Sequence, residues 1–351
     1  MTKAWRTTFA GGESFGAKEK AMAYIPKVVV LDPLTEEFKQ RWWEDLHDLP
    51  VELMLQDQVF PRALEDLVHA ATIIITRYEV VGDKTLAAAG DNLRLIIKLS
   101  RWPIGIDLKA CQERGVRVVC IPQLGSIAVA EHAMALILAC ARDLIRAHKG
   151  VVAGDYRRFG LIPQPTTERS FAFKWLPVNP FEVYGRVLGI VGFGEIGKEL
   201  AWRARAFGMT ILYWDKVRAP REIEEELEST FCPLDELLER SDFVSLHVPH
   251  TKETEKMIDR RRIRKMKSTA FLINTARGGV VDELALVEAL QSGQIAGAGL
   301  DVFAEEPLPA DHPLTKMDNV ILTPHIGGGS GRGREDLRVR IRELVLQYIC
   351  S

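Results

Sequence analysis

The sequence predicts an α/β protein made of two doubly wound domains, each built on a parallel sheet. Its 351 residues are 47% apolar, which suits about two domains with substantial cores. From residue 27 onward, short apolar runs alternate with longer segments of helical spacing, as in parallel sheets that are covered on both faces. The alternation comes in two series, separated by a long apolar segment and a proline-rich stretch.

Each series predicts its own set of buried strands. Those of the first series are expected at residues 27–31, 72–76, 93–99 and 116–119. Those of the second are expected at residues 186–192, 209–215, 242–248, 269–274, 296–303 and 319–324. Between the series, residues 126–150 contain strong helix formers without proline or internal glycine, and they predict one long buried helix. Residues 157–182 are rich in proline and lack a clear period, so they predict a long loop.

Composition and charge exclude several classes of protein. With 46 basic and 48 acidic residues the net charge is −2, which argues against a disordered chain and against nucleic acid as a partner. No run of about 18 apolar residues is present, so no membrane span is expected. The five cysteines include no C-x-x-C pair, so we expect no disulfide framework, no metal site and a reducing cytoplasm as the compartment. Residues 1–25 lack the apolar stretch of a signal peptide and are interpreted as a polar tail.

Residues 192–197 (GFGEIG) fit the dinucleotide-binding fingerprint G-x-G-x-x-G. The pattern alone is weak because glycine is common, but here it follows a predicted strand and precedes a helical segment. In that setting the first glycine permits a tight turn, the second lets the backbone approach a pyrophosphate, and the third allows close packing of strand and helix. The helix N-terminus adds N–H donors and positive potential. The second domain is therefore predicted to be Rossmann-like and to bind a dinucleotide.

Asp215 ends the next predicted strand, about 20 residues beyond the fingerprint. A carboxylate at this place accepts hydrogen bonds from the hydroxyl groups of the adenosine ribose, and it repels the 2′-phosphate of NADP. The expected cofactor is therefore NAD. The fingerprint alone would also suit a flavin, and Asp215 could instead be a turn residue at the end of a strand.

Polar side chains also follow three of the later predicted strands. They are Arg277, the pair Asp301 and Glu306, and His325. Because the carboxyl ends of parallel strands face the ligand crevice of an open α/β sheet, we expect these groups to converge on one pocket.

These residue types suit hydride transfer between an alcohol and a ketone. An alcohol loses hydride from carbon only if its hydroxyl proton leaves too, and a histidine such as His325 can exchange that proton near neutral pH. A carboxylate such as Glu306 would orient the imidazole and favour its protonated form. Arg277 offers a two-pronged donor array for a substrate carboxylate. Each residue also has an ordinary alternative role. Glu306 could be an exposed loop acid, His325 a hydrogen-bonded histidine at a strand end, and Arg277 the partner of a structural carboxylate.

Several sequence blocks occur in a characteristic order, namely LRLIIKL, VAEHAMALILACAR, GRVLGIVGFGEIG, LHVPHTKET, LINTARGGVVDE, LDVFAEEP and TPHIGG. Through these blocks the chain resembles the D-isomer-specific 2-hydroxyacid dehydrogenase family, which includes D-lactate, D-glycerate and D-3-phosphoglycerate dehydrogenases. The resemblance runs from about residue 72 to residue 328. It implies that Arg277 binds the substrate and its carbonyl, that Glu306 is the partner of the imidazole, and that His325 is the acid and base.

The resemblance also implies where NAD is held. The backbone of Glu195 and Ile196 would contact the pyrophosphate, and Asp215 the ribose. The adenosine side would be lined by Val248, Pro249 and Thr254, and the nicotinamide end by Thr275, Ala276 and Asp301. The predicted cofactor-binding residues are Gly192, Gly194, Glu195, Ile196, Gly197, Asp215, Val248, Pro249, Thr254, Thr275, Ala276, Arg277, Asp301, His325, Gly327 and Gly328.

A split architecture is implied as well. A smaller, flavodoxin-like substrate-binding domain would comprise residues 26–127 and 326–351, and the NAD-binding domain, residues 128–325, would be inserted into it. Closure about the two crossings would exclude water from the path of the hydride. The resemblance further implies a homodimer that forms through the NAD-binding domains and the helical segment 126–150.

One loop departs from the pattern of the family, whose members commonly hold the substrate carboxylate with the amides of a glycine-rich loop. Ser100, Arg101 and Trp102 stand there, followed by Pro103, which has no N–H. Arg101 would replace backbone donors with a charged side chain or face the solvent, and Trp102 would reshape the pocket. Arg77 matches a position where some relatives bind an acidic substrate, or it is structural. The predicted substrate-binding residues are Arg77, Ser100, Arg101 and Arg277.

We therefore predict a NAD-dependent oxidoreductase that interconverts a small 2-oxo acid and its D-2-hydroxy acid, similar to a hydroxypyruvate or glyoxylate reductase. The alternative is an NAD(H)-sensing interaction protein similar to the C-terminal-binding-protein corepressors, which keep the same arginine, glutamate and histidine. Turnover of a panel of 2-oxo acids separates the two hypotheses.

Overall fold

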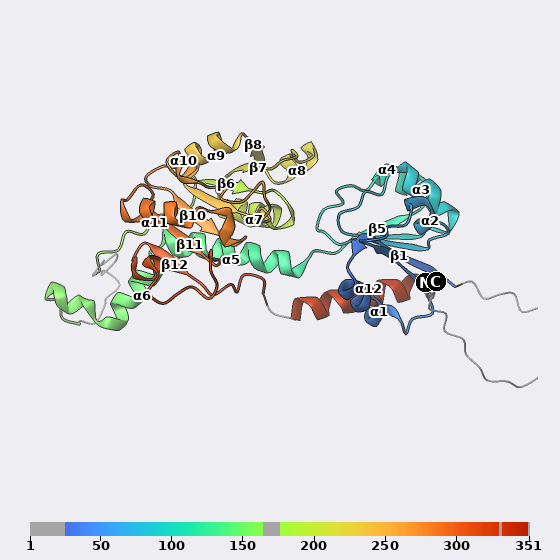
Figure 1. Cartoon of the computed structure of the whole chain (residues 1–351), viewed down its shortest axis with the longest axis horizontal. Coiled ribbons are helices and arrows are strands. Elements are labelled where there is room, and N and C mark those ends of the chain that lie inside the picture. The colour runs from blue at the N-terminus through green and yellow to red at the C-terminus, as the bar shows by residue number, and fades with distance from the viewer. Residues whose placement is uncertain (1–24, 164–175, 330–331, 350–351) are drawn as a thin grey trace, which may run out of the picture.

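Two parallel sheets organise the molecule, and helices pack against them (Figure 1). The computed structural model describes residues 25–163, 176–329 and 332–349. Residues 1–24 of the predicted tail and residues 164–175 of the predicted long loop lie outside this part of the chain. Each sheet belongs to its own α/β domain, as the sequence predicted.

The first sheet has five strands in the order β2-β1-β3-β4-β5, all parallel, which is the flavodoxin-like order. Its strands are β1 (Lys27–Leu34), β2 (Glu52–Asp57), β3 (Ile73–Thr76), β4 (Leu95–Lys98) and β5 (Arg117–Cys120). The helices around it are α1 (Glu36–Leu46), α2 (Leu64–Val68), α3 (Asp83–Ala89), α4 (Leu108–Glu113) and α12 (Arg332–Ile349).

Alternating residues of β1 explain how this sheet is covered. Val29 and Leu31 belong to an apolar cluster with α2, α3 and α4, whereas Val28 and Val30 belong to a cluster on the opposite face with α1 and α12. Helix α12, at the other end of the chain, contributes the buried side chain of Val345 to that second cluster. Helix α12 thus covers part of one face of the first sheet.

The second sheet has seven parallel strands in the order β12-β11-β10-β9-β6-β7-β8. The order reverses between β6 and β9, which is where dinucleotide-binding folds place their ligand. Its strands are β6 (Val187–Val191), β7 (Thr210–Trp214), β8 (Ser229–Phe231), β9 (Phe243–Leu246), β10 (Phe271–Asn274), β11 (Gly297–Leu300) and β12 (Val320–Leu322). Its helices are α7 (Glu195–Ala206), α8 (Arg221–Glu226), α9 (Leu234–Arg240), α10 (Arg260–Ile263) and α11 (Glu283–Gln291).

The predicted single helix over residues 126–150 is wrong. The structure has α5 (Leu124–Ala141) and α6 (Leu144–Ala153), separated by Asp143, whose φ of +51° lies in the left-handed region. Aspartate tolerates this conformation better than most residues because its short side chain bonds locally. Here the carboxylate accepts from Arg146 of α6 and from the Asn179 amide, so the turn is held from both sides.

Helix α5 is long and apolar enough to cross a membrane if length and composition alone are considered. The sequence reading that no such segment exists was therefore too strict. In the fold, α5 packs against α7 and against strands β10, β11 and β12, which is the setting of a core helix.

Two strands escaped prediction, and both lie at sheet edges. β2 pairs only with β1, and β8 pairs only with β7. Three of the six residues of β2 (ELMLQD) are polar, and β8 (STF) has three residues of which two are polar, so neither strand has the continuous apolar run that identified the others.

Candidate active site

The fingerprint loop has the geometry that its glycines predict. Gly192 has a φ of +96°, and a Cβ there would lie 2.7 Å from the His247 carbonyl carbon. A Cβ on Gly197 would lie 2.2 Å from the Gly192 carbonyl oxygen, so strand and helix approach as closely as they can. Gly194 is the exposed N-cap of α7 and has open space beside it. The open space beside Gly194 therefore lies at the N-terminus of α7, a helix of about three turns, where a phosphate can approach the backbone.

Asp215 lies directly beside this loop. Its Oδ2 accepts from the Phe193 amide at 2.6 Å, and its Oδ1 accepts from the Lys216 amide at 2.7 Å. The half-buried carboxylate therefore ties the end of β7 to the fingerprint loop and still has unused lone pairs for a ribose hydroxyl.

Two polar groups that sequence reading did not assign lie near the fingerprint loop. Lys198, in the first turn of α7, is 8% exposed; burial lowers its pKa, and the charges of Glu195 and Asp215 oppose that shift. Burial lowers the pKa of the half-buried His247 to about 3, and its Nε2 lies 2.8 Å from Ser245 Oγ. Lys198 could have been singled out from the sequence, because a lysine directly follows the last glycine of the fingerprint.

The predicted adenosine edge forms a tight turn. Thr254 Oγ1 donates to the Pro249 carbonyl at 2.5 Å and accepts from the Thr251 amide at 2.8 Å. Both Val248 and Thr254 are buried. The turn is thereby closed by its own hydroxyl group and presents an ordered wall beside β9.

The turn after β10 carries Arg277. Asn274, which sequence reading missed, donates to the Arg277 carbonyl at 3.0 Å and accepts from the Ala276 amide at 3.1 Å. The exposed guanidinium bonds only to the Ala276 carbonyl and forms no ion pair with any described residue. Thr275 Oγ1 is buried and has no hydrogen-bond partner in the described structure. The turn therefore presents a free cation and an unsatisfied hydroxyl.

His325 and Glu306 form a hydrogen-bonded pair. His325 Nδ1 lies 2.7 Å from Glu306 Oε2, and Glu306 Oε1 accepts from the Phe303 amide at 3.0 Å. Burial alone would raise the pKa of Glu306, but these two hydrogen bonds outweigh it and leave the pKa below its ordinary value. The carboxylate is thus charged at neutral pH, and the Nε2 atom of the imidazole remains free for a substrate.

The Arg277 turn and the Glu306 loop are in direct contact. A Cβ on Gly278 would lie 1.9 Å from the Phe303 carbonyl oxygen, so only glycine permits this approach. Because Phe303 also holds Glu306, and Glu306 holds His325, the structure links the three predicted catalytic positions through adjacent strand ends.

Asp301 holds the backbone that follows the histidine. It is 1% exposed, its Oδ1 accepts from Thr323 Oγ1 at 2.6 Å, and its Oδ2 accepts from the Gly327 amide at 2.8 Å. His132 of α5 approaches the same carboxylate at 3.2 Å. His325 itself has a φ of +56°, a conformation that costs free energy for a residue other than glycine. Asp301 stabilises the segment immediately beyond it, a role that sequence reading did not assign.

The predicted substrate residues divide into two groups. Arg77 follows β3; its Nε is buried without a partner among the described residues, and its guanidinium lies over the Tyr78 ring at 4.8 Å. Beside it, the buried Lys98 donates to the Arg77 carbonyl at 2.8 Å, and burial lowers the pKa of Lys98. Ser100 and Arg101 instead bond to helix α7 of the second domain.

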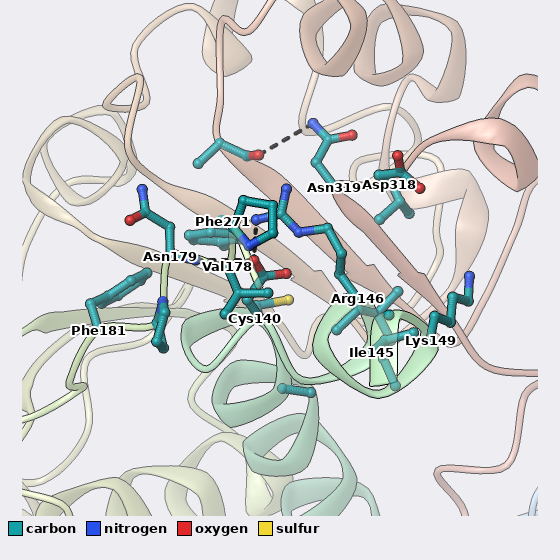
Figure 2. A pocket seen from close by; sticks show the side chains of 18 of the residues that line it. Cys140, Ile145, Arg146, Lys149, Val178, Asn179, Phe181, Phe271, Asp318 and Asn319 are labelled. Atoms are coloured by element: carbon teal, nitrogen blue, oxygen red, sulfur yellow. Dashed lines mark hydrogen bonds and ion pairs between the residues drawn. The ribbon is translucent and has the colours of Figure 1, made fainter. Parts of the chain in front are cut away.

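A large groove lies elsewhere. It has a volume of about 1070 Å³ and is bordered by α5, α6 and the amino ends of several strands, among them Phe271 and Asn319 (Figure 2). Ligands of open α/β sheets bind at the carboxyl ends of the strands, so this groove is not the catalytic site.

Comparisons with known proteins agree with this geometry. A model of the D-isomer specific 2-hydroxyacid dehydrogenase NAD-binding domain matches residues 134–327. The chain is 41% identical over 304 residues to a glyoxylate reductase of Thermococcus onnurineus (strain NA1), a match that covers 87% of this chain and 84% of the relative. A glyoxylate reductase of Pyrococcus furiosus is 40% identical over 305 residues, with 87% and 84% covered.

Among solved structures, D-lactate dehydrogenase from Aquifex aeolicus, complexed with NAD and lactic acid, is similar with a TM-score of 0.52 and 31% identity. The match covers 92% of this chain and 95% of that one. The chain belongs to the D-isomer-specific 2-hydroxyacid dehydrogenase family. Within that family it is a NAD-dependent dehydrogenase that interconverts a 2-oxo acid and a D-2-hydroxy acid, so the predictions of family, fold class, cofactor and reaction are confirmed.

Proposed function

We propose that the protein reduces glyoxylate and similarly small 2-oxo acids with NADH. The observation that carries this proposal is the His325–Glu306 pair at 2.7 Å beside the unpaired guanidinium of Arg277. The relatives named glyoxylate reductase support the choice of a small substrate. Steady-state oxidation of NADH with glyoxylate, hydroxypyruvate, pyruvate and bulkier 2-oxo acids tests it. Cofactor-dependent association with a protein partner, without turnover of any oxo acid, would instead favour an NAD(H)-sensing role.

The chain's own residues fit NAD. Open space at Gly194 leaves room for the pyrophosphate at the N-terminus of α7, and Asp215 has free lone pairs for the ribose. The unsatisfied Thr275 hydroxyl offers a bond at the nicotinamide end. The other predicted contacts, at Val248 and Thr254 among them, would line the adenosine side. When bound, NADH supplies the hydride.

In the direction of reduction, His325 gives a proton to the carbonyl oxygen of the substrate through Nε2. Its Nδ1 is engaged by Glu306, which fixes the ring and stabilises the imidazolium. Arg277 binds the substrate carboxylate and polarises the carbonyl. Arg77, with its buried and unpaired Nε, is the second cation placed at the carboxyl edge of the first sheet. Ser100 and Arg101 contribute indirectly, because their side chains are bonded to Glu195 and Glu199 of α7.

Replacement of Glu306 by glutamine is expected to lower kcat for reduction about 10-fold and to narrow its pH range. Because the pKa of Glu306 is lowered, its charge and its bond to His325 are present at neutral pH and are lost only as the pH falls through that lowered value. Glutamine keeps an acceptor but has no charge, so the protonated imidazole is less favoured and reduction fails first on the alkaline side. The measurement is the pH profile of kcat/KM for the oxo acid.

The matched control is Glu305→Gln, which removes the neighbouring exposed carboxylate and leaves the pair intact. Superimposable pH profiles for Glu306→Gln and the wild type would rule out this role of the carboxylate.

Replacement of Asp215 by serine is expected to reduce the preference for NADH over NADPH by about 10-fold or more, because charge-assisted bonds to the ribose are lost and repulsion of the 2′-phosphate disappears. The ratio of kcat/KM for the two cofactors measures this. Asp311→Ser, a change of an exposed aspartate, serves as the control. An unchanged ratio in Asp215→Ser would contradict the ribose role.

The domain boundaries belong to the same proposal. Residues 26–127 and 326–351 would form the substrate-binding domain, and residues 128–325 the NAD-binding domain. The burial of α12 in the cluster beneath the first sheet supports this division. The start of α5 at Leu124 lies close to the proposed crossing. Four free thiols in the described structure, at Cys111, Cys120, Cys140 and Cys232, support a cytoplasmic location.

A homodimer through the NAD-binding domains is proposed as well. Helix α6 and the residues after it expose the large apolar side chains Leu144, Ile145, Val151, Val152, Phe159 and Ile162. This arm projects from the domain (Figure 1), and residues of α6 such as Ile145 and Lys149 line one wall of the groove of about 1070 Å³ (Figure 2). An arm and a groove on the same domain suit a two-fold interface, in which each copy inserts its arm into the other.

Substitution of Val152 by aspartate is therefore expected to convert the dimer to a monomer, because it would bury a charge in the interface. Sedimentation velocity measures the change. Val59→Asp, at an equally exposed valine of the first domain, is the control and is expected to leave the dimer intact. A wild-type protein that sediments as a monomer would contradict the interface.

A further inference from the structure

The loop Ser100–Trp102 connects the two domains in an unexpected way. It follows β4 of the first sheet, yet Trp102 is 2% exposed and belongs to the apolar cluster formed by α5, α7, β6 and β7 of the second domain. A large aromatic side chain from the first domain is thus packed in the core of the second. We call residues 100–102 the docking loop.

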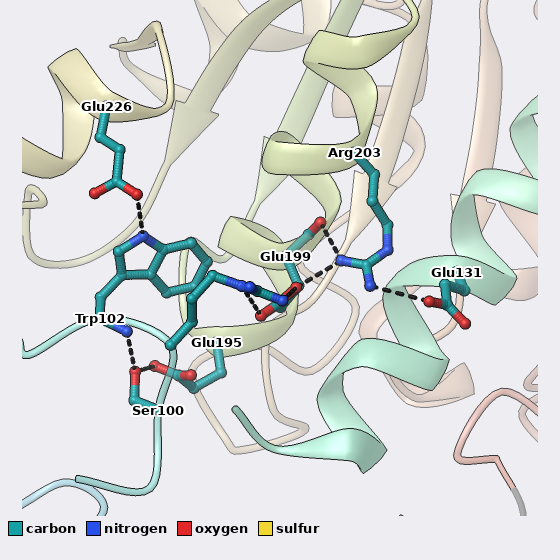
Figure 3. Close-up of polar contacts among 8 residues, drawn as sticks. Ser100, Trp102, Glu131, Glu195, Glu199, Arg203 and Glu226 are labelled. Carbon is teal, nitrogen blue, oxygen red and sulfur yellow. Dashed lines mark hydrogen bonds and ion pairs between the residues drawn. The ribbon is translucent and has the colours of Figure 1, made fainter. Parts of the chain in front are cut away.

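Hydrogen bonds fix the loop at two places on the second domain. The Trp102 indole Nε1 donates to Glu226 Oε1 at 3.0 Å, at the end of α8. Ser100 Oγ donates to Glu195 Oε1 at 2.8 Å and accepts from the Trp102 amide at 3.0 Å. Figure 3 shows Trp102 and Ser100 facing these two carboxylates. Because Glu195 is the first residue of α7, the loop reaches the helix N-terminus that we assign to the pyrophosphate.

Arg101 adds a buried ion pair. Its Nε lies 2.8 Å from Glu199 Oε1 and its Nη2 lies 3.2 Å from Oε2, so the contact is bidentate. The Glu199 side chain is only 2% exposed, and Arg203 also pairs with it. The Arg101 guanidinium lies over the Trp202 ring at 4.5 Å. A carboxylate this buried depends on its cations, so removal of Arg101 would leave part of its charge uncompensated.

The same loop has few amides to offer a substrate. The Ser100 amide donates to the Lys98 carbonyl at 2.9 Å, the Trp102 amide donates to Ser100 Oγ, and Pro103 has none. The side chains that replace glycine therefore dock the loop on the other domain, and the Ser100 and Trp102 amides are already engaged.

The docking loop changes the mechanics of the two domains. The chain crosses between the sheets twice, between β5 and α5 and between β12 and α12. Two crossings define a hinge axis, and a third attachment away from that axis fixes the angle about it. We propose that Arg101 and Trp102 are positioning residues that set the angle between the domains, and with it the distance from the edge of the first sheet to the cofactor site. This inference rests on the proposed function for its kinetic consequences.

Arg101→Ala is the main test. The KM for glyoxylate is expected to rise about 10-fold or more and kcat to fall, because misplacement of a binding edge by about 1 Å has effects of this size. The Kd of NADH, measured by fluorescence without oxo acid, is expected to change less than about 2-fold, because Arg101 pairs with Glu199 and the residues assigned to NAD, with the Ser100–Glu195 bond, are left in place. Small-angle X-ray scattering is expected to show a wider distribution of interdomain distances. A purely structural role would lower the Tm and leave the KM and the scattering profile unchanged.

Further variants keep the test decisive. Arg101→Lys restores the charge without the bidentate geometry and is expected to recover part of the KM. If Arg101→Ala does not fold, Trp102→Phe takes its place. This variant keeps an aromatic ring in the apolar cluster but loses the bond to Glu226, and it is expected to raise the KM for glyoxylate by a smaller factor. Arg260→Ala breaks an exposed bidentate pair with Glu288 and is the control.

The outcomes separate the two proposals. Wild-type KM and wild-type scattering in Arg101→Ala would overturn the role of the docking loop. If the wild-type protein reduces no oxo acid, the proposed function fails, but scattering and NADH binding still decide whether the loop sets the domain angle.

Discussion

The variant His325→Ala is expected to lose about 1,000-fold in kcat for the reduction of glyoxylate, or about 4 kcal/mol of transition-state stabilisation. His325 is the imidazole held by Glu306 with its Nε2 free, and alanine leaves no group that can deliver a proton to the carbonyl oxygen. The Kd of NADH is expected to remain within about 3-fold of the wild-type value, because the pyrophosphate and ribose contacts assigned to the fingerprint loop and to Asp215 are unchanged. Single-turnover kinetics and fluorescence titration measure the two quantities.

His69→Ala provides the comparison, since His69 is exposed and lies on the first domain away from the strand ends of the second. Full kcat in His325→Ala would refute the assignment of the acid and base. A loss of NADH affinity that accounts for the whole effect would shift the role of His325 from proton transfer to cofactor binding.

The variant Arg277→Ala is expected to lose about 1,000-fold in kcat/KM for the oxo acid, mostly through a KM that rises about 100-fold, because a bidentate charged contact is removed. The guanidinium has no carboxylate partner in the described structure, so its loss costs the fold little. The Tm of Arg277→Ala is accordingly expected to differ from that of the wild type by less than about 2 °C.

Arg277→Lys tests whether charge alone suffices. A lysine restores the cation but not the planar two-pronged geometry, so recovery of less than about 10-fold in kcat/KM is expected. Arg221→Ala, which removes an exposed guanidinium paired with Glu225, is the control. If Arg277→Ala were to lower the Tm strongly while KM stayed constant, the residue would be structural.

The sequence allowed prediction of those features that depend on local chemistry. The fingerprint glycines, Asp215 at the next strand end and the polar groups after β10, β11 and β12 are each defined by a strand and the few residues beyond it. The central strands were predictable because they are continuous apolar runs, buried on both faces. The strands β2 and β8 were not, since polar residues interrupt any such run in them.

The features that escaped prediction depend on contacts distant in sequence. Asp143, where the predicted long helix is broken, accepts a hydrogen bond from the Asn179 amide, far along the chain. Asp301 meets His132 across the second domain. The docking loop was recognised as a departure from the family pattern, but its partner Glu199 lies in another domain, and no local rule connects the two.

The way in which α12 covers the first sheet has a consequence for synthesis on the ribosome. Val28, Ile75 and Ile97 pack in one cluster with Ile341 and Val345, and all seven strands of the second sheet are translated between the two groups. Until α12 leaves the exit tunnel, one face of the nascent five-stranded sheet stays uncovered, while the seven-stranded sheet is already synthesised. The first sheet to be translated is therefore the last to have both of its faces covered.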